Sequence, residues 1–158
     1  LDNEQLMYFK NINATIAPAS LTKLMTSLIL IENYNLSDYI EISLPSDYIY
    51  EGKVAYLKSG QKMTVESLLE FILIYSANDA CYAVVQLFSE NNDDFLDLMN
   101  KKAQELGMNN TNFKNYINNQ FKSAFNINET IEDVLSMINN NNINKYYGRI
   151  LKLKYKYY

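Results

Sequence analysis

Apolar residues recur at helical spacing along much of the chain, and this pattern predicts a cluster of helices. The run that begins at Ser20 is apolar nearly all round in its middle, so we expect a central, buried helix there. Thr64 is placed to cap a second helix, and Gly107 to end the helix that begins near residue 92 in a left-handed conformation. The predicted helices span residues 20–33, 65–75, 78–88 and 92–106.

Strands are predicted from shorter segments. Residues 5–10 read as a strand, and the tail 145–158 alternates apolar with basic residues at period two. This basic, aromatic tail could instead contact anionic lipid or nucleic acid, but regular alternation favours a strand. Short extended pieces are expected at 39–42 and 54–57, and a further helix at 129–138. The pattern as a whole indicates a mixed fold of helices and strands.

Composition narrows the chemistry. The 158 residues suit one domain, and the net charge of −4 argues against a general nucleic-acid binder. Histidine is absent, which excludes Ser-His-Asp and Cys-His nucleophiles and histidine-bearing zinc sites. We expect neither a metal nor a cofactor. Cys81 is the single cysteine and is expected to be a buried thiol. We recognise no signal peptide and no apolar stretch long enough to span a bilayer.

Ser20 and Lys23 lie three residues apart at the start of the first helix and therefore share one face. Backbone N–H groups and the positive end of the helix dipole favour a reactive serine there. An amine made neutral by burial can serve such a serine as its general base. In the structural alternative Ser20 is an N-cap and Lys23 is solvated. A second Ser-x-x-Lys, Ser59–Lys62, contains glycine and reads as a turn.

Ser76 and Asn78 lie at the junction between two apolar helices. The serine could relay a proton, and the asparagine could hold Lys23 and bind a substrate amide. Either residue could equally be a helix cap, and Ser89–Asn91 repeats the Ser-x-Asn pattern without further context. We expect Ser20 and Lys23 to face Ser76 and Asn78 across one cleft.

With these two motifs the chain resembles the penicillin-binding serine D-alanyl-D-alanine carboxypeptidases, which are related to the serine β-lactamases. The resemblance is strong from Leu1 to about Asn115, and it is faint at 128–137. Beyond that almost nothing is recognisable. The segments that carry it occur in family order: Pro18–Thr26, Ser76–Ala80, Met99–Ala103, Leu106–Met108 and Asn110–Asn115.

The resemblance implies roles for the two motifs. Ser20 corresponds to the nucleophile that forms an acyl-enzyme, and Lys23 to its base. Ser76 corresponds to the second proton-relay serine, and Asn78 to the ligand of the substrate amide. The backbone N–H of Ser20 would form half of the oxyanion hole. The implied substrate is a peptidoglycan peptide ending in D-Ala-D-Ala, with β-lactams as covalent inhibitors. The implied setting is the cell envelope or periplasm, with a role in cell-wall synthesis and cell shape.

The family's third motif, Lys-Thr-Gly or Lys-Ser-Gly on a sheet strand, lies far downstream of the second, and we do not find it there. We therefore expect an α+β fold of the β-lactamase/DD-peptidase type, represented by its helical part and an incomplete antiparallel sheet. Residues 1–158 would form one partial catalytic domain. Two other functions stay open: a non-catalytic remnant that binds a peptide or partner, and a β-lactamase-like hydrolase.

Overall fold

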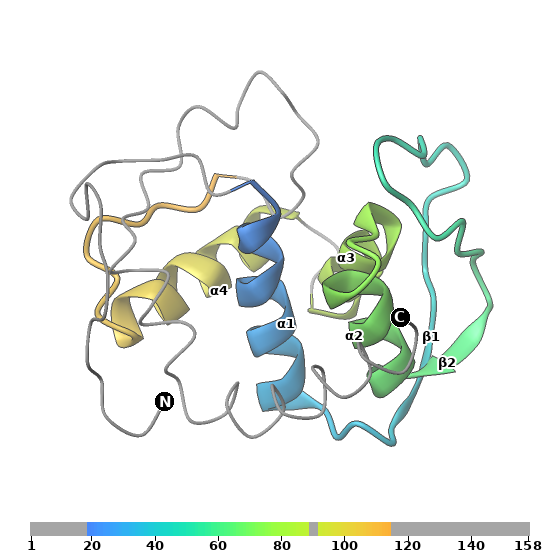
Figure 1. The fold of residues 1–158 in the computed structure, drawn as a ribbon, viewed down its shortest axis with the longest axis horizontal. Coiled ribbons are helices and arrows are strands. Elements are labelled where there is room, and N and C mark those ends of the chain that lie inside the picture. Colours follow the sequence, from blue (N-terminus) through green and yellow to red (C-terminus); the bar gives the residue numbers. More distant parts are fainter. Residues whose placement is uncertain (1–18, 89–91, 115–158) are drawn as a thin grey trace.

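The computed structural model describes residues 19–88 and 92–114. Within them, α1 lies between α4 on one side and α2 and α3 on the other (Figure 1). None of the described helices is long and apolar enough to cross a membrane. In chain order the elements are η1 (Ala19–Leu21), α1 (Thr22–Asn33), β1 (Tyr39–Glu41), β2 (Lys62–Thr64), α2 (Val65–Leu73), α3 (Asn78–Phe88) and α4 (Asn92–Glu105).

The position of α1 follows from its sequence. A helix that is apolar nearly all round must be covered on all sides, and α1 contacts α2, α3 and α4. Met25, Leu28 and Leu30 of α1 are completely buried. The neighbouring helices turn one apolar face inward, with Leu68 and Ile72 on α2 and further residues on α3 and α4. The predicted helical cluster is thereby confirmed.

Local signals set several helix ends. The Thr64 side chain accepts a hydrogen bond from the backbone N–H of Ser67 at 3.2 Å, as expected of an N-cap. Gly107 follows α4 with a φ of +75°, a left-handed conformation that glycine adopts without penalty. Beyond it, the Asn100 side chain both donates to and accepts from the backbone of Phe113, which holds that ring in the core.

The described sheet is small. β1 and β2 pair antiparallel, with Ile40 opposite Met63 and both side chains buried. The sequence predicted β1 but not β2, since a three-residue strand is too short for alternation to show. The short extended piece expected at 54–57 does not form a strand, because the backbone N–H groups of Ala55 and Leu57 bond to a side chain on α3 instead of a neighbouring strand. The connection from β1 to β2 curves past α3 (Figure 1).

Other boundaries differ slightly from expectation. α2 ends at Leu73, two residues before the predicted end, and the first helix begins with a 3-10 turn at Ala19–Leu21. The predicted helices at 78–88 and 92–106 are confirmed within one residue at each end. The predicted strands at 5–10 and 145–158 and the helix at 129–138 lie outside the described residues, as does Ser89–Asn91.

Candidate active site

Ser20 lies in η1, directly before α1. It is not the N-cap of that helix: the cap position is Leu21, and no side-chain cap bond is made there. The preceding residue, Ala19, has a φ of +53°, which is uncommon for a residue with a side chain. The Ser20 hydroxyl is exposed and lies 3.3 Å from the Ser76 hydroxyl, which donates to it. The capping alternative for Ser20 is therefore wrong.

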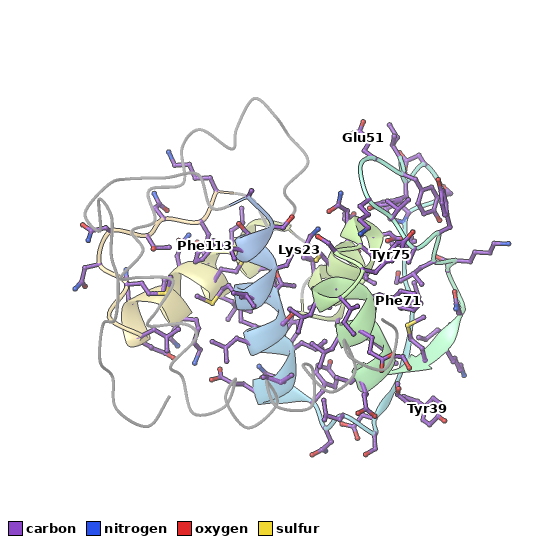
Figure 2. The ribbon with its side chains drawn as sticks, viewed as in Figure 1. Lys23, Tyr39, Glu51, Phe71, Tyr75 and Phe113 are labelled. Atoms are coloured by element: carbon purple, nitrogen blue, oxygen red, sulfur yellow. The ribbon has the colours of Figure 1, made fainter. Side chains whose placement is uncertain are left out.

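Lys23 projects from the first turn of α1 toward α2 and α3, whereas Phe113 lies on the opposite side of α1 (Figure 2). Its side chain is buried, with the residue only 3% exposed. Its amine donates to the backbone oxygen of Ser76 at 2.5 Å and to the Ser76 hydroxyl at 2.9 Å. The structure thus joins Ser20, Ser76 and Lys23 in one continuous hydrogen-bonded chain.

Ser76 is held in an unusual conformation between α2 and α3. Its φ is +62°, which lies in the left-handed region and costs about 1–3 kcal/mol for such a residue. The backbone N–H of Ala77 bonds to the Phe71 oxygen at 2.9 Å, and that bond fixes the turn. In this conformation the oxygen and the hydroxyl of Ser76 both point to the same amine. The strain is thus found where the three polar groups meet.

Burial lowers the pKa of Lys23 below its ordinary value, because a buried amine loses the hydration of its charged form. The positive charge of Lys53 lowers this pKa further, whereas the negative charge of Asp79 raises it. Burial also raises the pKa of the nearby Cys81 thiol to about 12, so the thiol is neutral at pH 7. A neutral thiol does not hold the amine in its charged form. Lys23 is therefore suited to accept a proton.

Asn78 is the first residue of α3 and is buried. Its side-chain amide donates to the backbone oxygen of Glu51 at 2.9 Å, and its backbone N–H donates to the backbone oxygen of Lys53 at 2.8 Å. Its side-chain oxygen makes no hydrogen bond within the described part of the chain. The sequence interpretation placed Asn78 against Lys23, but the structure directs its amide to the connection between β1 and β2.

Asp79 is a buried carboxylate to which the sequence interpretation assigned no role. The residue is 0% exposed, and its two oxygens accept from the backbone N–H groups of Ala55 and Leu57, both at 2.9 Å. A third bond, at 3.1 Å, comes from Ala80. Three donors satisfy the buried charge and fasten residues 55–57 to the start of α3. An acid in the first turn of a helix was the available sequence signal.

Comparison with known proteins shows to which family the chain belongs. Residues 1–149 match the family model described as D-alanyl-D-alanine carboxypeptidase. The chain belongs to the D-alanyl-D-alanine carboxypeptidase family. It is 40% identical over 119 residues to the D-alanyl-D-alanine carboxypeptidase DacF of Bacillus subtilis (strain 168), a match covering 72% of this chain and 30% of that relative. The chain spans less than half the length of the curated relatives it matches.

Solved structures of family members have a fold similar to that of this chain. The carboxypeptidase DacD from Francisella tularensis aligns with a TM-score of 0.76 and 31% identity, over 87% of this chain and 35% of that one. The Streptomyces K15 DD-transpeptidase aligns with a TM-score of 0.75 and 25% identity, over 89% of this chain and 58% of that one. The predicted α+β fold of the β-lactamase/DD-peptidase type is confirmed.

Two further patterns can now be compared with the carboxypeptidase motifs. Ser59–Lys62 is indeed a turn, with Gly60 at a φ of +81° and the Ser59 hydroxyl bonded to Leu44. Lys58, Ser59 and Gly60 also spell Lys-Ser-Gly, a match that the sequence interpretation passed over. This tripeptide precedes Ser76 in the chain and lies exposed on the turn before β2. In order and in setting it differs from the family's third motif.

No group of three or more His, Cys, Asp or Glu side chains in the described ranges is arranged to hold a metal ion. The candidate site instead consists of two hydroxyls, one amine and one amide. These groups suit nucleophilic acyl transfer, in which a hydroxyl attacks a carbonyl carbon and an amine carries the proton.

Proposed function

We propose that the protein is a serine-type D-alanyl-D-alanine carboxypeptidase acting on peptidoglycan stem peptides, and that residues 1–158 form part of its single catalytic domain. The observation that carries this proposal is the hydrogen-bonded chain from Ser20 through Ser76 to the buried amine of Lys23. Family membership supplies the substrate class. We place the enzyme at the cell envelope, outside the cytoplasm, where that substrate occurs.

The reaction would proceed in two halves. The Ser20 oxygen attacks the carbonyl carbon of the penultimate D-alanine, and its proton passes through the Ser76 hydroxyl to neutral Lys23. The C–N bond to the terminal D-alanine then breaks, and the same proton goes to the leaving amine. Water hydrolyses the ester on Ser20, which releases the shortened peptide and restores the serine. Hydroxyl hydrogens rotate, so Ser76 can donate toward Lys23 once the amine is neutral.

Two other groups would bind the substrate. The backbone N–H of Ser20 would donate to the oxyanion, since an amide aimed at the developing charge lowers the barrier. The Asn78 side chain would bind an amide of the peptide. Its oxygen is buried and has no hydrogen-bond partner among the described residues, so a donor from the substrate would satisfy it. A β-lactam would acylate Ser20 in the same way, as a covalent inhibitor.

Ala77, between Ser76 and Asn78, favours a carboxypeptidase over a β-lactamase-like hydrolase, since class A β-lactamases carry Asp at this position. To test the function, the full-length protein is incubated with a peptide ending in D-alanyl-D-alanine and, separately, with a penicillin. We expect release of D-alanine, with penicillin forming a slowly hydrolysed adduct. Fast penicillin hydrolysis without D-alanine release would identify a β-lactamase-like enzyme. A protein showing neither reaction would be the non-catalytic remnant.

The acylation rate of the full-length protein is expected to rise with pH, with a midpoint below the ordinary lysine value of about 10.4. The reason is that only neutral Lys23 accepts a proton, and its lowered pKa makes the neutral form available at lower pH. Lys23→Arg should slow acylation about 100-fold and remove this rise, since arginine stays charged. Lys53→Arg, at an exposed neighbouring lysine, is the matched control. Unchanged acylation in Lys23→Arg would exclude Lys23 as the base.

A further inference from the structure

Four tyrosine rings gather beside α3, three of them on the connection between β1 and β2. Tyr48 lies 4.9 Å from Tyr82 on α3 and 5.0 Å from Tyr50, measured between ring centroids. Tyr50 in turn lies 5.6 Å from Tyr56, with the two ring planes inclined by 39°. The rings of Tyr48 and Tyr82 are partly buried, whereas Tyr50 is 40% and Tyr56 70% exposed. The cluster therefore ends in a pair of rings that face solvent.

The exposure of Tyr56 is built into the loop. Its φ of +57° is left-handed, which is rare for a bulky residue, and its side chain contributes nothing to the core in return. The Asp79 carboxylate imposes this conformation, because it binds the backbone N–H groups of the residues on either side, Ala55 and Leu57. The Tyr50 hydroxyl closes the loop by donating to the Leu57 oxygen at 2.5 Å. Strain without burial points to a functional surface.

The same loop is joined directly to the candidate active site. Glu51 and Lys53 lie between Tyr50 and Tyr56 in the chain, and their backbone oxygens accept hydrogen bonds from Asn78. Asp79, the clamp of the loop, is the next residue in the chain. The two exposed rings are therefore fixed relative to the residue proposed to bind the substrate amide.

We propose that Tyr50 and Tyr56 form a platform that binds the sugar rings of the peptidoglycan glycan strand. This rests on the proposed function. A tyrosine offers an apolar ring face to the C–H face of a sugar. The adjoining exposed charges, Glu51 and Lys53, have opposite signs, which favours an uncharged ligand over an anionic lipid or a nucleic acid. The clamp by Asp79 holds the platform ready before the ligand arrives.

The test measures binding of the full-length protein to a peptide-free glycan probe, uncharged oligomers of N-acetylglucosamine, and, separately, to a soluble peptide ending in D-alanyl-D-alanine. Tyr56→Ala should weaken glycan binding about 3- to 10-fold, the effect of losing one aromatic contact, and leave peptide binding unchanged. Tyr56→Phe should keep the affinity, because it keeps the ring. Tyr39→Ala is the matched control: Tyr39 is 77% exposed but lies on β1, far from Glu51 (Figure 2).

Each result decides the proposal. A Tyr56→Ala protein that binds glycan as well as the unchanged protein overturns it, and so does a loss confined to the peptide. An equal loss in Tyr39→Ala would show that exposed tyrosines act non-specifically and would also overturn it. Penicillin labelling of Ser20 in the same samples tests the proposed function separately. Labelling without Tyr56-dependent glycan binding leaves the function standing and removes the platform.

Discussion

The Ser20→Ala variant of the full-length protein is expected to show no covalent labelling by a penicillin. The adduct requires a bond from the Ser20 oxygen, and alanine has no atom that can replace it. Ser76 should not substitute for it, since its hydroxyl is committed to Lys23 and its strained backbone fixes its direction. The measurement is mass spectrometry of the intact protein after incubation with the antibiotic.

Ser59→Ala is the matched control for that experiment. Ser59 begins the second Ser-x-x-Lys of the chain, but it lies on an exposed turn and bonds to the backbone of Leu44. Labelling of Ser59→Ala should equal that of the unchanged protein. Persistent labelling of Ser20→Ala would show that another residue is the nucleophile. The hydrogen-bonded chain would then be a structural feature only.

The helices were predictable because each of them repeats its signal several times. Between two and four apolar turns in each helix, a cap at Thr64 and a glycine at Gly107 agree with one another, and such agreement between independent signals specifies an element. The three-residue strand β2 repeats nothing, so alternation could not reveal it. The extended piece expected at 54–57 has residues that would suit a strand, but its backbone donors at Ala55 and Leu57 are taken by Asp79.

The candidate site was predictable in its residues but not in its geometry. Motif spacing identified Ser20, Lys23 and Ser76, and the structure brings these three together. The left-handed conformation of Ser76 depends on how α2 ends and α3 begins, which no local pattern encodes. The partners of Asn78 come from residues 51 and 53, more than twenty positions earlier in the chain. Contacts of that kind are set by tertiary packing.

Burial of α1 links the fold to the chemistry. The packing of α2 and α3 against α1 removes Lys23 from water, and this burial is the main cause of its lowered pKa. The first turn of a surface helix would leave the same lysine hydrated and charged at neutral pH. The apolar core and the proposed base are therefore parts of one arrangement.

Residues 1–158 alone are expected to release D-alanine from a D-alanyl-D-alanine peptide at least about 1,000-fold more slowly than a full-length family member such as DacF. Family resemblance implies a strand that carries the third motif and an oxyanion donor, and no such motif follows Ser76 here. Loss of one oxyanion donor typically slows a reaction about 100- to 1,000-fold. The strand would also supply the lysine of the third motif and one wall of the site. Their loss would raise the pKa of Lys23 toward its ordinary value.

These effects act on one site and need not add, but all of them slow the reaction. The assay compares D-alanine release by the purified 158-residue protein and by DacF under the same conditions. Circular dichroism should first show that the shorter protein keeps its helices, so that slow turnover is not due to unfolding. Turnover within about tenfold of DacF would mean that Ser20, Lys23 and Ser76 suffice without the strand. The inference from the family that the site needs the third-motif strand as well as the helices would then be wrong.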